Sequence, residues 1–223
     1  MNEISNVPAK QLNANGWLNG FIGVLLFSGS LPATKLAILG FSPLFLTSAR
    51  ATIAGLLALA ALTIFKQKRP NRNQIVPLII VALGVVLGYP LLSALALQHI
   101  TSAHSFVFVG LLPLATALFG VWRGGERPKP LFWLFSILGS LLVVGYAVAQ
   151  GLTASLNGVL LMLAAIIVCG LGYAEGARLS KTLGGWQVIS WALLISLPVM
   201  LPLSFIYMPP GFENVNAGAW ISL

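Results

Sequence analysis

The chain has 223 residues, of which 58% are hydrophobic and only 7% are charged. A soluble domain carries about a quarter of its residues as charged side chains, so this composition cannot cover a folded core with a water-solvated surface. The net charge of +8 does not indicate nucleic-acid binding, because the basic residues lie at the ends of apolar segments instead of gathering on one face.

Seven apolar stretches follow one another along the chain, each about 20 residues long, the length a helix needs to cross a bilayer. Helices are expected because open strands would leave backbone groups unpaired in lipid, and barrel strands would alternate in hydropathy. The first stretch is too long for a signal-peptide core and is expected to be retained. The predicted helices are 17–38, 43–65, 75–97, 103–122, 131–149, 156–177 and 186–207.

The connections between these helices alternate in positive charge. Basic residues follow the second, fourth and sixth helices: Lys66, Lys68, Arg69 and Arg72, then Arg123, Arg127 and Lys129, then Arg178 and Lys181. Loops rich in Lys and Arg stay on the cytoplasmic side. The pattern therefore predicts a multi-pass cell-membrane protein whose N-terminal tail, residues 1–16, is cytoplasmic.

The last residues, 217–223, resemble the opening of a further helix that then stops. We expect truncation at Leu223, because a lipid-compatible segment rarely ends after one turn. A short interfacial tail is the alternative. The predicted fold class is therefore an all-α polytopic membrane bundle with seven complete transmembrane helices and the start of an eighth.

A short repeat suggests internal symmetry. The triplet Leu-Asn-Gly opens the first predicted helix at 18–20 and the sixth at 156–158. Five helices separate the two copies, so the second copy enters the membrane from the opposite face. This is an inverted repeat, an architecture that many secondary transporters use for alternating access. It divides the chain into a first five-helix repeat, 17–150, and an incomplete second repeat, 156–223.

The stretch 94–118 resembles the junction of the third and fourth helices in the drug/metabolite transporter superfamily, EamA type. The matching positions are Pro113-Leu114 within a helix, Gly125-Glu126 at its close, Pro32 and Lys35 in the first helix, and Arg50 in the second. The resemblance implies ten helices in two five-helix repeats, of which helices eight to ten are missing here. It also implies export of small metabolites, such as amino acids, or of drugs.

Two cations fall in the outer half of the predicted bundle. Lys35 is expected near the outer interface, either snorkelling to the headgroups or lining the mouth of a cavity. Arg50 lies about 10 Å below the outer end of its helix, where an arginine is costly unless it faces water or a partner. Together they could bind an anionic group such as a carboxylate. For Arg50, a structural contact to backbone carbonyls or anionic lipid is the alternative.

Glu175 is predicted near the inner end of the sixth helix, too far along the membrane normal to pair with Lys35 or Arg50. Pairing with Arg178, three residues on, is expected, and a proton-coupling role for the carboxylate is the sharper alternative. His99 and His104 flank an outer turn and make a poor metal site without nearby carboxylates.

Prolines predict interruptions in several helices. Tyr89-Pro90 and Pro113 are expected to break the third and fourth helices near mid-membrane, and Pro198 and Pro202 to do the same in the seventh. The carbonyls freed in this way could line a cavity, which makes Tyr89 and Pro113 candidate substrate-binding residues. Glycine pairs at 84 and 88 and at 172 and 176 predict close helix packing.

A secondary transporter is the main functional hypothesis, with a small metabolite and the lipid bilayer as partners and a homodimer left open. A seven-helix receptor fits less well, since its N-terminus would lie outside, and no lysine suited to a retinal pump follows Lys181. An enzyme is disfavoured: the chain has no Asp, and Cys169, its one cysteine, is expected to be a buried apolar side chain. No cofactor or metal is expected. A non-functional fragment is the remaining alternative.

Overall fold

The structure, a computed structural model, describes residues 14–149, 155–210 and 217–222. The prediction of a cytoplasmic tail therefore lies largely outside the described residues. The chain forms two compact units, Met1–Ser30 and Leu31–Leu223. The described part is helical, with these elements: α1 (Ala14–Ser28), α2 (Ser30–Ala37), α3 (Pro43–Ile64), α4 (Arg72–Val81), η1 (Ala82–Gly88), α5 (Tyr89–Ala96), α6 (Ser102–Val109), α7 (Leu112–Gly124), α8 (Pro130–Ala149), α9 (Leu156–Leu183), α10 (Gly185–Ile206) and α11 (Ala217–Ile221).

Among the described residues, six helical segments are long and apolar enough to cross a membrane: Gly20–Ala37, Pro43–Ile64, Arg72–Ala96, Ser102–Gly124, Leu156–Leu183 and Gly185–Ile206. A shorter apolar helix covers Pro130–Tyr146. Large apolar side chains are exposed along these helices, including Leu57, Leu142 and Val199. Such surfaces are stable only when lipid covers them, so the described chain is a multi-pass membrane protein.

The sixth predicted helix is longer than expected, because α9 continues to Leu183. Arg178 and Lys181 therefore lie in the last turns of a helix and not in a loop. The turn into α10 is made at Gly184, whose φ of 90° favours glycine.

Two of the predicted helix interruptions are present. Before Pro90 the backbone widens into the π-helical segment η1, and the N–H of Tyr89 bonds the carbonyl of Gly84. The wider turn accommodates a proline, which has no N–H and would crowd the carbonyl four residues back. A second break separates α6 from α7, and Pro113 lies in the first turn of α7. The prediction was wrong for Pro198 and Pro202, since α10 runs through both.

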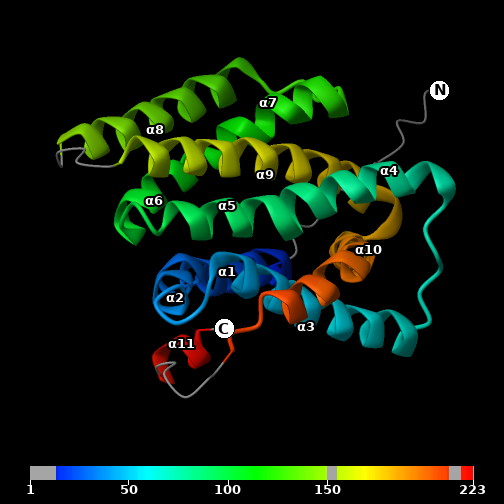
Figure 1. Cartoon of the computed structure of the whole chain (residues 1–223). Coiled ribbons are helices and arrows are strands. Elements are labelled where there is room, and N and C mark those ends of the chain that lie inside the picture. Colours follow the sequence, from blue (N-terminus) through cyan, green and yellow to red (C-terminus); the bar gives the residue numbers. More distant parts are fainter. Residues whose placement is uncertain (1–13, 150–154, 211–216, 223) are drawn as a thin grey trace, which may run out of the picture. The chain divides into compact units, whose positions relative to one another are not determined.

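Within the unit Leu31–Leu223, α9 packs against α4, η1, α5 and α7, while α10 packs against α3. The connections that follow α3 and α9 lie together on the right of Figure 1. Side chains join them there: Gln74 Nε2 donates to Thr182 Oγ1 at 3.3 Å, and Gln187 Nε2 donates to Gln67 Oε1 at 3.3 Å. Lys181 also lies 4.0 Å from Glu126, just after α7. The basic residues that follow α3, those that follow α7 and those in the last turns of α9 thus gather at one end of this unit, which we call the basic end.

Candidate functional site

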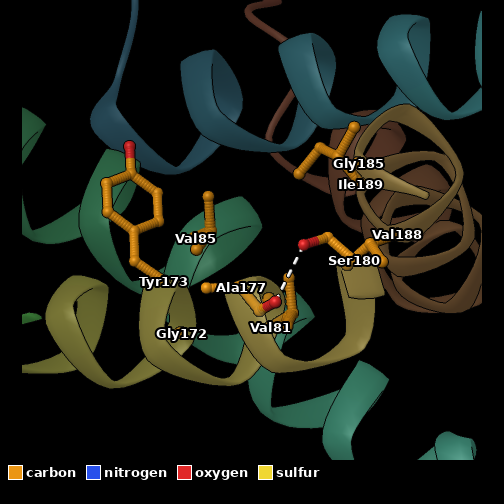
Figure 2. Close-up of a pocket in the computed structure, with 10 residues that line it drawn as sticks. Val81, Val85, Gly172, Tyr173, Ala177, Ser180, Gly185, Val188 and Ile189 are labelled. Atoms are coloured by element: carbon orange, nitrogen blue, oxygen red, sulfur yellow. Dashed lines mark hydrogen bonds between the residues drawn. The ribbon is translucent and has the colours of Figure 1, made fainter. Parts of the chain in front are cut away.

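An apolar pocket of about 440 Å³ lies between the α4–η1 segment, α9 and α10 (Figure 2). Its lining residues are Val81 and Val85, then Gly172, Tyr173, Gly176, Ala177 and Ser180 of α9, then Gly185, Val188 and Ile189. Cavities of this size that are mostly apolar, with a few polar groups, are typical of small-molecule sites. We call it the apolar pocket.

The hollow arises from the spacing of small residues on α9. Positions 173, 176, 177 and 180 share one helical face, and the two middle positions are Gly176 and Ala177. A Cβ added at Gly176 would lie 3.8 Å from Val81 Cγ2 and 4.0 Å from Val188 Cγ1, which is ordinary van der Waals contact. The short side chains thus leave space between the larger Tyr173 and Ser180.

A close helix contact holds one wall of the pocket in place. A Cβ added at Gly84 would lie 2.4 Å from the carbonyl oxygen of Val168 and 3.1 Å from Gly172 Cα. No other residue fits there without moving backbone, so the predicted glycine packing is confirmed for Gly84 and Gly172. The contact fixes η1 directly against α9.

Polar groups in the pocket are few. Ser180 Oγ donates to the carbonyl of Ala177 at 2.8 Å (Figure 2). Tyr173, two turns earlier on the same helix, adds a phenolic hydroxyl. No charged side chain lines the pocket. These groups can orient a solute by hydrogen bonding while apolar walls bind its body. Within the described residues there is also no cluster of three His, Cys, Asp or Glu that could hold a metal ion.

Glu175 lies on a different face of α9 and contacts two arginines. The carboxylate is fully buried; Oε1 accepts a 2.6 Å hydrogen bond from Arg123 Nε, and Oε2 lies 2.8 Å from Arg178 Nη2. The predicted pairing with Arg178 is confirmed. The pairing with Arg123, at the end of α7, was missed. The sequence did contain a signal for it, because the helices that carry Arg123 and Glu175 were both predicted to end on the cytoplasmic side.

Arg50 bonds two groups from other elements. Nη1 donates to Thr34 Oγ1 at 2.9 Å, and Nη2 donates to the carbonyl of Ser222, just after α11. The side chain is half-buried. The bond to Ser222 is a contact of the kind that the structural alternative for Arg50 describes, and a substrate-binding role for Arg50 stays a prediction.

The side chain of Lys35 is half-buried and does not line the apolar pocket. Its ammonium donates to the carbonyls of Leu97 and Ile100, the latter at 3.3 Å. Leu97 caps the C-terminal end of α5, where free carbonyls and the negative end of the helix dipole favour a cation. Thr34 and Lys35 are neighbours on α2, so Arg50 bonds the residue next to Lys35.

Neither Tyr89 nor Pro113 is among the residues that line the apolar pocket. Tyr89 is 7% exposed and belongs to a core cluster with Ile100, Phe108 and Cys169. Pro113 is exposed at the start of α7. Cys169 is buried as expected.

His99 lies in the turn between α5 and α6, and His104 lies in the first turn of α6. His104 Nδ1 lies 2.8 Å from Thr101 Oγ1, while His99 is exposed.

Two residues that line the apolar pocket, Tyr173 and Ser180, were not predicted as site residues. Their spacing along one face of α9, around two small residues, was the available signal.

Apolar exposed helices, helix breaks at prolines and a solute-sized pocket define the class of the molecule as a multi-pass membrane protein. Residues 14–147 match the EamA-like transporter family. The uncharacterized transporter YdeK of Bacillus subtilis (strain 168) is 63% identical over 209 residues, which cover 94% of this chain and 73% of that protein. The chain belongs to the EamA-like transporter family, within the drug/metabolite transporter superfamily, and is a membrane transporter. No solved structure gives a significant match.

Proposed function

We propose that this transporter exports a small, largely apolar solute by alternating access, and that the apolar pocket is part of the solute path. The single observation that carries the proposal is a pocket of about 440 Å³ between three helices, lined by apolar groups with two hydroxyls. Amino acids with apolar side chains and small drugs fit this chemistry. The breaks at η1 and between α6 and α7 supply points at which helices could hinge.

The proposed topology has seven transmembrane helices and the start of an eighth, in inverted repeats 17–150 and 156–223. In this proposal the protein lies in the cell membrane and its N-terminus is on the cytoplasmic side. The gathering of basic residues at one end of the unit Leu31–Leu223 supports this topology, because such loops stay on the cytoplasmic side.

The residues predicted from sequence have different roles in this proposal. Arg50 and Lys35 would meet an anionic group of the solute only after exchanging their present carbonyl partners. Tyr89 and Pro113 shape the two helix breaks. Proton coupling at Glu175 would require a proton to compete with Arg123 and Arg178. A Glu175→Gln variant that transports with unchanged pH dependence would remove that role.

The pocket can be tested by filling it. Gly176→Leu places a large side chain between Val81 and Val188, whereas Gly176→Ala adds only a methyl group at contact distance. Cells expressing each variant are screened for resistance to toxic amino-acid analogues and drugs, with the amount of folded protein measured by size-exclusion chromatography. We expect Gly176→Leu to lose transport at least about tenfold, as the loss of about 1.4 kcal/mol of solute binding would produce, and Gly176→Ala to keep it. Unchanged transport by folded Gly176→Leu would remove the pocket from the solute path.

A further inference from the structure

A second groove, of about 480 Å³, lies at the basic end, and its character is opposite to that of the apolar pocket. It is lined by the segment after α3 and by the junction of α9 and α10: Lys66, Gln67, Lys68, Arg69, Asn71, Gln74, Thr182, Leu183, Gln187 and Trp191. We call it the basic groove. Two hydrogen bonds between these linings, Gln74 to Thr182 and Gln187 to Gln67, hold its sides together.

The cations of this groove have no anionic partner among the described residues. The described carboxylates are Glu126 and Glu175, and their ion pairs involve Arg123, Arg178 and Lys181. Three positive side chains, Lys66, Lys68 and Arg69, thus surround a cavity without a protein counter-charge in the part of the chain described here. Their mutual repulsion would fall if an external anion bound between them.

Two buried polar atoms on the α10 side of the groove also lack a partner. Trp191 Nε1 and Gln187 Oε1 are both shielded from solvent and make no hydrogen bond in the described structure. A buried donor left unpaired costs about 1–3 kcal/mol, so the site favours a ligand that satisfies it. The indole N–H can donate to a phosphate oxygen, and the amide oxygen can accept from a hydroxyl.

The backbone holds the basic segment in an uncommon conformation. Lys66 follows the C-cap of α3 with a φ of 47°, and the Gln67 N–H bonds the carbonyl of Leu62 at 2.9 Å. This is the geometry of a helix end that usually has glycine at the position of Lys66. Lys66 therefore adds a cation to the lining of the groove, although a positive φ is unfavourable for residues other than glycine.

The groove begins where the apolar surface of the helices ends. Ile64 and Phe65 are exposed immediately before Lys66, and the rings of Phe65 and Trp186 make an edge contact with centroids 5.7 Å apart. Aromatic residues of this kind mark the level of the lipid headgroups. A lipid could therefore lay its acyl chains on the exposed apolar side chains while its headgroup enters the groove.

We propose that the basic groove binds the phosphate of an anionic lipid headgroup that also carries a hydroxyl. Lys68 and Arg69 contact the phosphate, Trp191 donates to it, and Gln187 accepts from the hydroxyl. Basic pockets between membrane helices are suited to anionic headgroups. This site is separate from the apolar pocket and does not depend on the identity of the transported solute.

Native mass spectrometry of the full chain in neutral detergent tests the proposal with three probes. These are phosphatidylglycerol, phosphatidylcholine with the same acyl chains, and inorganic phosphate. The variant Lys68→Gln/Arg69→Gln removes one lysine and one arginine from the groove. The control Arg127→Gln/Lys129→Gln removes the same two residue types from the connection after α7, outside the groove.

We expect the wild-type chain to bind phosphatidylglycerol at least about tenfold more tightly than phosphatidylcholine. The groove variant should lose about 30-fold in that affinity, since each cation near a membrane contributes roughly fivefold, and the control should lose far less. Trp191→Phe, which keeps the ring but removes the donor, should lose about tenfold. Equal losses in both double variants would overturn the proposal, and inorganic phosphate binding as tightly as phosphatidylglycerol would overturn the assignment to a lipid.

Discussion

At each end of the unit Leu31–Leu223 two cations are paired, but with different kinds of partner. At the basic end, Arg123 and Arg178 flank a buried carboxylate, Glu175. At the opposite end, Lys35 and Arg50 bond backbone carbonyls at the ends of α5 and α11. A carboxylate supplies a full counter-charge, whereas helix carbonyls supply only partial charges. The first arrangement is therefore expected to be the more costly one to disrupt.

The largest effect should follow from stripping Glu175 of both partners. Arg123→Met/Arg178→Met leaves a fully buried carboxylate unpaired, and we expect a loss of about 3–5 kcal/mol in the free energy of unfolding. Denaturation by sodium dodecyl sulfate in mixed micelles measures this loss. Adding Glu175→Gln to the double variant should restore most of the stability, because no buried charge remains. Failure of that rescue would mean that the arginines act mainly through packing.

The helix contact between the two ends should come second. Gly84→Ala forces a methyl group against the backbone of α9, and overpacking of this kind costs about 1–3 kcal/mol. Thermal unfolding in detergent measures the effect. Gly139→Ala is the matched control, since a Cβ there meets nothing within 4 Å. Equal melting temperatures for the two variants would contradict the close contact of η1 with α9.

A smaller effect is expected at the opposite end. Lys35→Met keeps most of the stem of the side chain but leaves the carbonyls of Leu97 and Ile100 without their cation, which should cost about 1–2 kcal/mol. The same detergent denaturation measures it, with Lys129→Met as an exposed lysine control. If Lys35→Met matched the loss of the double arginine variant, the proposed difference between the ends would be wrong.

The smallest effect is expected for an exposed pair at the basic end. Lys181 and Glu126 are 4.0 Å apart and both side chains are at least half exposed, so Lys181→Ala should change stability by less than about 0.5 kcal/mol. A thermal melt in low salt and in high salt checks this. A larger loss, removed by salt, would show that the pair contributes more than its geometry indicates.

Local patterns predicted some contacts correctly and could not reach others. The pairing of Glu175 with Arg178 follows from three-residue spacing on one helix. The contact of Glu175 with Arg123 spans 52 positions, and that of Lys35 with Leu97 spans 62. No periodicity within a segment encodes which helix end lies beside it. The continuity of α10 through Pro198 and Pro202 was mispredicted for a related reason, since neighbouring helices can stabilise a segment that proline weakens.

The sequence alone determined which segments are apolar enough for a membrane and where the cations lie at their ends. The reason is that a charge in hydrocarbon is costly whatever the arrangement of the helices. It also marked Gly84 and Gly172, which allow the close approach of η1 to α9. Only the tertiary structure decided which partner each cation has. It also decided that small residues of α9 leave the apolar pocket and that the connection after α3 helps to form the basic groove. Those features come from helices distant in sequence, whose contacts depend on packing and not on local composition.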